Sequence, residues 1–130
     1  MLPQPHRLKR SAEVVNVQQQ GRSWRHPLCI LLSKAGEAEA SRFAFIASKR
    51  VGKAVVRNRV KRLLREAVRL HLDNIQPGWD CVWIARPQLS QASFAEVETA
   101  VLQLLARAKL ITAVPRTEYN ISENLGGRSD

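Results

Sequence analysis

Apolar residues recur at helical spacing through the middle of the chain. From about residue 54 to residue 71, valine, leucine and alanine return every three or four positions, and most of the positions between them are charged. This spacing gathers the apolar side chains on one side of an α-helix. Gly52 breaks the pattern just before the segment. The pattern therefore predicts an amphipathic helix from about Ala54 to His71.

Three apolar runs have the composition of β-strands. The runs SWRHPLCILLS (residues 23–33) and SRFAFIASK (residues 41–49) are separated by the small, polar segment KAGEAEA. This order predicts two strands of a hairpin with a loose loop, although the Ala and Glu of the loop could also make it slightly helical. The third run, CVWIARP (residues 81–87), follows the turn IQPGWD, and we expect its strand to end at Pro87.

Two further helices are expected near the ends of the chain. RLKRSAEVVNVQQQG (residues 7–21) predicts a short helix that begins at Arg10 or Ser11 and stops at Gly21, although its valines would also suit a strand. SFAEVETAVLQLLARAKL (residues 93–110) opens with a Ser-x-x-Glu capping box and carries apolar residues at helical spacing. It predicts the last helix.

The predicted order, helix, strand, strand, helix, strand, helix (α-β-β-α-β-α), indicates an α+β fold. We expect one single-layer sheet of three to four strands with helices packed on it. A chain of 130 residues is long enough for one modest core. We therefore expect a single domain over residues 1–114. Residues 115–130 lose all apolar periodicity and are expected to form a disordered tail.

The positive charge of the chain is concentrated in one segment. The formal net charge is +10, and residues 49–69 contain nine Lys or Arg and one Glu, so 9 minus 1 gives +8 of that total. A charge of this size favours a polyanionic partner, either nucleic acid or an acidic membrane surface.

Most of the basic residues of the central helix fall on one side of it. At about 100° per residue, they occupy roughly 140° of arc, opposite the apolar residues. This basic row consists of Arg57, Asn58, Lys61, Arg62, Arg65 and Arg69. Like charges at i and i+4 repel, so a merely solvated helix face would normally intersperse acids among them. Arginine suits phosphate oxygens and stacks on bases, which favours RNA or DNA over a lipid surface.

Other residue types give no sign of a catalytic or metal site. Cys29 and Cys81 lie in apolar runs without the paired spacing of a zinc site, and we expect buried free thiols. Asp, Glu and His are scattered, and we expect Trp79 and Trp83 to pack in the core or in a turn and not to serve as platforms for bases. MLPQPHRLKR has no apolar stretch like a signal peptide, and no run is long enough to span a membrane, which favours the cytoplasm.

The central stretch ASKRVGKAVVRNRVKRLLREAVR (residues 47–69) closely resembles the signature of the bacterial ribonuclease P protein component. That family has a Lys-rich strand end, a Val-Gly-Lys-Ala turn and an Arg-Asn-Arg helix. RLKRSAEVVNVQQQG and DCVWIARP resemble its first helix and third strand, so the resemblance covers about residues 7 to 110. It also implies a rare left-handed strand-helix-strand crossover, against the general right-handed rule.

The resemblance implies a role as the protein subunit of a ribonucleoprotein endoribonuclease. In that family the RNA subunit carries the active site and uses Mg²⁺ to remove the 5′ leader of precursor tRNA, so no catalytic residue, cofactor or metal site is expected on the protein. The implied partners are one catalytic RNA per protein monomer and precursor tRNA, with no membrane. By the same resemblance, the catalytic RNA contacts Lys49, Arg50, Lys53, Arg57, Asn58, Arg59, Lys61, Arg62 and Arg65.

A cleft between the first helix and the sheet binds the 5′ leader in this family. The resemblance places Val14, Gln18, Phe43, Phe45 and Arg86 there. The family often has phenylalanine at the two first-helix positions, where this chain has Val14 and Gln18. Base-aromatic stacking contributes about 1–3 kcal/mol per base. We therefore expect weaker leader binding, unless Phe43 or Phe45 faces the cleft instead of packing in the core.

Two other classes of function would share the basic charge. A plain RNA-binding structural protein, such as a ribosomal component, would not prefer leader-bearing tRNA over mature tRNA. A membrane-surface or helix-binding module is disfavoured by the predicted sheet and the arginine-rich row.

Overall fold

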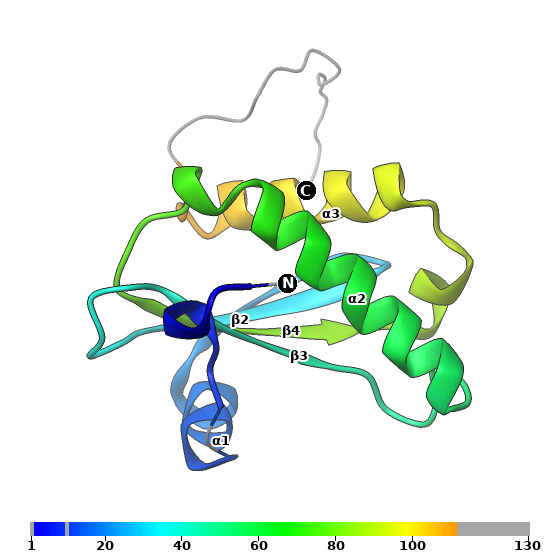
Figure 1. The fold of residues 1–130 in the computed structure, drawn as a ribbon, viewed down its shortest axis with the longest axis horizontal. Coiled ribbons are helices and arrows are strands. Elements are labelled where there is room, and N and C mark those ends of the chain that lie inside the picture. The colour runs from blue at the N-terminus through cyan, green and yellow to red at the C-terminus, as the bar shows by residue number, and fades with distance from the viewer. Residues whose placement is uncertain (1, 10, 112–130) are drawn as a thin grey trace.

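The computed structural model describes residues 2–9 and 11–111, and within them one mixed sheet carries helices on both of its faces (Figure 1). The main elements are α1 (Ser11–Gln20), β1 (Arg22–Arg25), β2 (Cys29–Ala35), β3 (Arg42–Ile46), α2 (Ala54–Leu70), β4 (Trp79–Ala85) and α3 (Phe94–Arg107). Short 3-10 helices are η1 (Gln4–His6), η2 (Leu72–Asn74) and η3 (Pro87–Gln91). The predicted α+β class is confirmed. The predicted tail at 115–130 lies outside the described residues.

The sheet has the strand order β1-β2-β4-β3. β2 is antiparallel to both β1 and β4, whereas β3 is parallel to β4. Trp83 in β4 lies between Leu31 of β2 and Phe45 of β3. The prediction that β2 and β3 form a hairpin is therefore wrong, because β4 inserts between them. Local sequence pattern could not reveal this pairing, because β4 begins more than 30 residues after the end of β3.

The first apolar run forms two strands instead of one. His26 and Pro27 make a tight turn, in which the His26 backbone N–H donates to the Cys29 carbonyl at 2.9 Å. The Leu28 N–H donates to Nδ1 of His26 at 3.0 Å, which fixes the same turn. β1 and β2 then pair as a hairpin. The observed order is therefore α-β-β-β-α-β-α, with one strand more than the predicted order.

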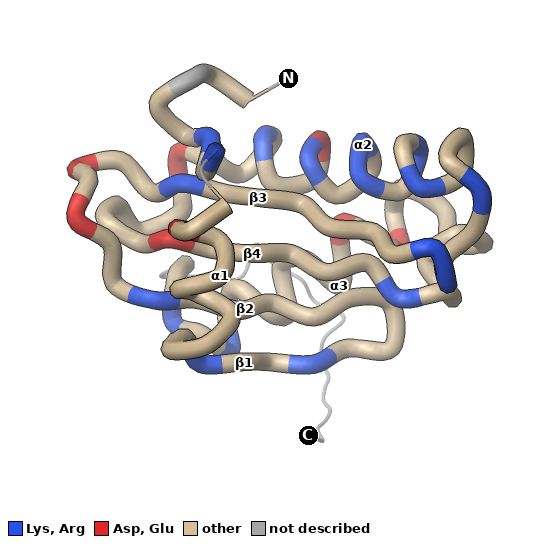
Figure 2. Tube along the Cα trace, turned by 90° about the horizontal axis from the view of Figure 1, so that it is seen from below, with Lys and Arg blue, Asp and Glu red and all other residues tan. Residues whose placement is uncertain are grey.

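The connection from β3 through α2 to β4 is a crossover between neighbouring parallel strands. In Figure 2, β3 and β4 run in the same direction, α2 lies behind the sheet, and β4 lies below β3. Seen from the α2 side with both strands pointing up, β4 is to the left of β3. This is the left-handed crossover that the family resemblance implied, and the opposite of the usual hand.

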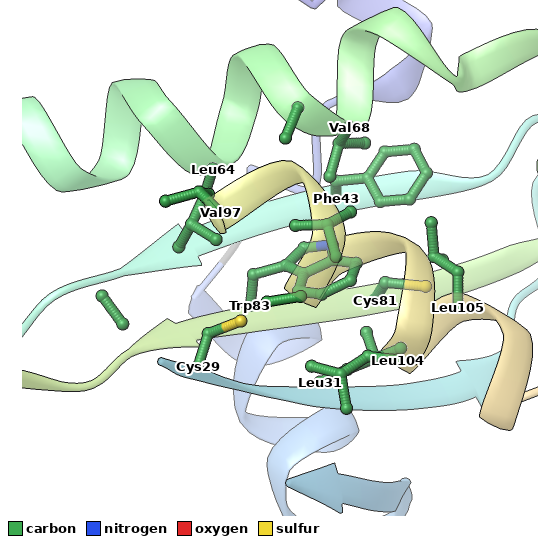
Figure 3. Close-up of a cluster of buried hydrophobic side chains, with 14 of the residues drawn as sticks. Cys29, Leu31, Phe43, Leu64, Val68, Cys81, Trp83, Val97, Leu104 and Leu105 are labelled. Atoms are coloured by element: carbon green, nitrogen blue, oxygen red, sulfur yellow. The ribbon is translucent and has the colours of Figure 1, made fainter. Parts of the chain in front are cut away.

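Alternation along the strands supplies apolar side chains to both faces of the sheet. The larger core lies between the sheet and the helices α2 and α3, and it includes the fully buried Leu31, Trp83 and Leu104 (Figure 3). A smaller cluster lies under α1, where Leu8 and Val17 pack on Val82. Burial of these side chains on both faces holds the helices in place.

The predicted helix boundaries are nearly those observed. α1 begins at Ser11 and ends one residue before Gly21. A Cβ added at Gly21 would lie 2.8 Å from the Ser33 carbonyl oxygen. Only glycine allows this close approach of the end of α1 to β2. α2 ends at Leu70, one residue earlier than predicted. The capping box that precedes α3 is present with both of its hydrogen bonds.

Candidate nucleic-acid interface

Helix α2 is anchored by its apolar side, and its basic row points away from the core. Val60, Leu64, Ala67 and Val68 have no exposed surface. On the other side, Asn58 and Arg62 are exposed and the rest of the basic row is partly exposed. Figure 2 shows Lys and Arg positions along α2 at one edge of the molecule. The 17 residues of α2 therefore display positive charge along a rod of roughly 25 Å.

One cation of the basic row is paired with an acid of the same helix. Nε of Arg69 donates to Oε1 of Glu66 at 3.0 Å, and its Nη2 contacts the same oxygen. The hydrogen bond from Arg69 lowers the pKa of Glu66 below its ordinary value. Within residues 2–9 and 11–111, no ion pair neutralises the other four cations of the row. Most of its charge is therefore available to an external anion.

The turn before α2 extends the basic surface. Lys49, Arg50 and Lys53 are exposed there, while Val51 is buried and fixes the turn to the core. Lys53 occupies the N-cap position without a side-chain cap, and the first turn of α2 contains no acid. The free N–H groups of a helix start carry partial positive charge, which adds to that of the three side chains.

Arg59 lies to one side of the basic row. Its Nη2 donates to the Ser90 carbonyl oxygen at 2.8 Å, which ties the start of α2 to η3. Arg57 is partly buried, and its Nε has no hydrogen-bond partner among the described residues. These two arginines are thus more constrained by the protein than Lys61 and Arg62.

The structure does not bring together the five residues expected in one leader-binding cleft. Val14 packs in the small cluster under α1, and Gln18 is exposed on the same helix. Phe43 is buried in the other core, on the α2 side of the sheet, and Phe45 packs against that core. The grouping is therefore wrong for the two phenylalanines, because alternation turns odd-numbered β3 residues away from α1.

The face of the sheet next to α1 instead presents aliphatic side chains. Ala44, Ile46 and Ile84 are partly exposed there and border the cluster under α1. α1 covers only one end of this face in Figure 2, and the opposite ends of the strands are open. Arg86 follows β4 in extended conformation, so alternation places it on this α1 side.

A groove of about 690 Å³ lies at the outer edge of β3, which sequence reasoning did not anticipate. The N-terminal segment forms one wall, because Arg7 pairs with Phe43 as a parallel bridge and the Leu8 N–H donates to the Phe43 carbonyl at 2.9 Å. The basic row forms the other wall. Residues from both walls and from β3 line the groove, among them Leu2, Arg7, Lys9, Phe45, Arg62 and Arg65.

The remaining candidate groups have structural positions. Trp83 is fully buried and Trp79 packs against the core, as predicted. Nε2 of His71 lies 2.7 Å from Oε2 of Glu98, which joins α2 to α3.

Among the described residues, no three His, Cys, Asp or Glu side chains are grouped so that they could hold a metal ion. In the same residues, no helix has the length and hydropathy needed to cross a membrane.

The fold and the basic row define a small basic α+β protein with an exposed cationic surface. Comparison with known proteins identifies the family to which this chain is similar. The family model for ribonuclease P matches residues 2–109. The ribonuclease P protein component of Roseiflexus castenholzii is 41% identical over 107 residues, which cover 82% of this chain and 88% of that protein. The component from Alkaliphilus metalliredigens is 39% identical and covers 82% and 96%.

A solved structure supports the same assignment. The ribonuclease P protein from Thermotoga maritima superimposes with a TM-score of 0.71 at 30% identity, over 78% of this chain and 96% of that one. The chain belongs to the ribonuclease P protein family. It is thus a protein component of a ribonucleoprotein endoribonuclease that processes tRNA, and an RNA is its partner in the holoenzyme.

Proposed function

We propose that the basic row and the turn before α2 bind the catalytic RNA of ribonuclease P. The observation that carries this proposal is the orientation of α2: Val60, Leu64, Ala67 and Val68 on its apolar side are fully buried, while its row of cations faces outward. The contact residues are those named from the family resemblance, from Lys49 in the turn to Arg65 on the helix. Nη2 of Arg59 donates to the Ser90 carbonyl oxygen, so Arg59 would bind the RNA through its other N–H groups.

The expected contribution of this surface is electrostatic. Each phosphate that a cation neutralises releases counterions, so affinity falls steeply as salt rises. A cationic protein also lowers the repulsion between catalytic RNA and precursor tRNA, two polyanions that must come together. We therefore expect the holoenzyme to work at lower salt and lower Mg²⁺ than the RNA alone. Mg²⁺ is used by the RNA subunit in this proposal and not held by protein side chains.

The 5′ leader of precursor tRNA is proposed to lie on the α1 side of the sheet. Val14 and the partly exposed Ile46 and Ile84 border this face, and Gln18 and Arg86 are assigned to it in this proposal. Aliphatic side chains and one cation support contact with a single strand, but without the stacking that aromatic side chains provide. Phe43 and Phe45 are not part of this proposed surface.

The remaining expectations complete the proposal. Residues 1–114 act as one RNA-binding domain, one protein monomer joins one catalytic RNA, and the complex works in the cytoplasm. A precursor tRNA is the substrate, and its mature 5′ end is the product.

The test is a triple variant, Arg57→Ala with Lys61→Ala and Arg65→Ala. Its affinity for a bacterial ribonuclease P RNA should fall at least tenfold at moderate salt, and the slope of log affinity against log salt should flatten by about 2 to 3, or roughly 0.9 per lost phosphate contact. The matched control is Arg22→Ala with Arg25→Ala and Lys109→Ala, three exposed cations elsewhere on the chain. An unchanged salt slope for the first variant would count against the assignment.

A second measurement separates this function from that of a plain RNA-binding structural protein. Binding of precursor and mature tRNA is compared with the catalytic RNA present and absent. A ribonuclease P subunit should favour the leader-bearing form in the presence of the RNA. Equal affinity for both forms would favour the structural alternative.

A further inference from the structure

The groove at the outer edge of β3 has an aromatic side chain beside it. Phe45 lines the groove and is partly exposed, although its inner part packs against the core. Cζ of Arg65 lies over this ring, 5.5 Å from its centroid. A planar guanidinium and an aromatic ring are the two surfaces on which unpaired RNA bases stack.

The walls of the groove are strongly cationic. Arg62 and Arg65 come from the basic row, and Arg7 and Lys9 come from the N-terminal segment on the opposite side. Among the described residues, Glu66 is the one acid in the lining, and it is paired with Arg69. Phosphates that follow the groove would therefore meet cations on both sides.

The volume of the groove limits what it can take. About 690 Å³ falls within the range of about 300–1,000 Å³ that is typical of sites for one small organic molecule. This is room for one unpaired nucleotide but not for a duplex. The combination of cations and an aromatic surface is typical of single-strand binding.

We propose that this groove binds one unpaired nucleotide of the catalytic RNA, with its base against Phe45 and Arg65 and its phosphates between the N-terminal segment and α2. The inference rests on the proposed binding of that RNA by the basic row. Catalytic RNA is favoured over the leader because the groove shares Arg62 and Arg65 with the row. The proposed leader surface lies next to α1 and meets the groove only at the β3 edge, where Leu8 and Ala44 line the groove.

The first test is Phe45→Leu, which keeps an apolar side chain but removes the ring. Affinity for the catalytic RNA should fall at least about fivefold, the factor that corresponds to the lower end of base-aromatic stacking. Phe94→Leu is the matched control, because Phe94 also packs partly buried against the same core but does not line the groove. Equal affinities of the two variants would overturn the stacking part of the proposal.

The second test avoids the core entirely. Lys9 is exposed and lines the groove, whereas Lys109 is exposed after α3 and does not. Lys9→Ala should lower the salt slope for catalytic RNA by about 0.7 to 0.9, the value for one phosphate contact, and Lys109→Ala should leave it unchanged. Identical slopes for the two variants would overturn the proposed cationic wall.

A crosslinking experiment identifies the RNA in the groove. Cys29 and Cys81 are fully buried, so a photoreactive group can be attached selectively to a Lys9→Cys variant. In the holoenzyme with precursor tRNA, crosslinks should form to an unpaired nucleotide of the catalytic RNA. Crosslinks to the tRNA leader, or only to duplex segments, would overturn the assignment.

Failure of this inference can be told apart from failure of the proposed function. If the triple variant of the basic row loses affinity while Phe45→Leu and Lys9→Ala bind normally, the groove is empty but the row still binds catalytic RNA. If the triple variant also binds normally, the proposed function itself fails.

Discussion

Arg42 and Asp80 form a two-point ion pair between the neighbouring strands β3 and β4. Nε of Arg42 donates to Oδ1 of Asp80 at 3.0 Å, and Nη2 donates to Oδ2 at 2.8 Å. Nη1 of the same guanidinium donates to Oε2 of Glu13 in α1 at 3.0 Å. The hydrogen bond to Asp80 is the main reason that the pKa of Arg42 is raised. One arginine thus joins the sheet to the helix that borders the proposed leader surface.

Replacing Arg42 by Met should destabilise the protein by about 2–3 kcal/mol, because Asp80 would remain largely buried without its cation. Urea unfolding followed by circular dichroism measures this change. Glu13→Gln is the control, and it should cost less than about 1 kcal/mol because that contact is more exposed. Equal losses for the two variants would mean that Asp80 is not the partner that matters.

Placing an aromatic side chain on α1 should strengthen leader binding. Gln18→Phe puts a ring at a position assigned to the proposed leader surface, and it should raise holoenzyme affinity for leader-bearing tRNA about five- to tenfold through stacking. Gln19→Phe is the matched control, since Gln19 is also exposed on α1 but points about 100° away. The readout is the ratio of affinities for precursor and mature tRNA. A ratio unchanged from that of the parent protein would remove Gln18 from the leader surface.

Gly52→Ala should disturb both stability and RNA binding. Gly52 has φ of +152°, and an added Cβ would lie 3.0 Å from both Cβ and Cγ1 of Val56. The cost should be about 1–3 kcal/mol, and the start of α2 with Lys53 should shift, which weakens binding of the catalytic RNA. Gly78→Ala is the control, because Gly78 has φ of +87° but no atom within 4 Å of an added Cβ. Its variant should lose stability alone.

The two cysteines predict lower stability in alkali. Burial raises the pKa of Cys29 to about 12 and also raises that of Cys81, with a smaller contribution from the charge of Asp80. In the unfolded chain both thiols ionise near pH 8.5, so above this pH the unfolded state binds fewer protons than the folded state. The free energy of unfolding should therefore fall as pH rises from about 8.5 towards 12, by up to about 1.4 kcal/mol per pH unit for each thiol.

Denaturant titrations at several alkaline pH values measure this slope. A Cys29→Ala variant should show a slope smaller by about the contribution of one thiol, whatever its stability at neutral pH. In the folded protein at pH 8, neither cysteine should react with iodoacetamide. Rapid labelling of either thiol would contradict the burial on which the prediction rests.

Local sequence pattern predicted the helices well because their signals are short in range. The amphipathic spacing from residue 54 onward and the capping box at Ser93 depend on residues three or four positions apart. The same is true of the outward orientation of the basic row, which follows from burial of the opposite face. These predictions needed no information about how distant segments pair.

The errors came from relationships that local pattern does not contain. Insertion of β4 between β2 and β3 is a long-range pairing, and it made the expected hairpin wrong. The side on which Phe43 and Phe45 lie depends on strand register, which a single sequence does not fix. Pro27 was a usable signal for the break between β1 and β2, since proline is rare inside a strand. No local signal marked Arg42 as the partner of Asp80.

The bridge between Arg7 and Phe43 also affects how readily the protein could associate with other copies of itself. β3 is an edge strand, and an uncovered edge offers unpaired N–H and C=O groups on which another copy of the chain could add a strand. The Leu8 N–H occupies the Phe43 carbonyl, and the buried Leu2 and Leu8 hold the segment in place. The N-terminal residues thus cover part of the β3 edge and limit self-association. A chain shortened past Leu8 should aggregate more readily.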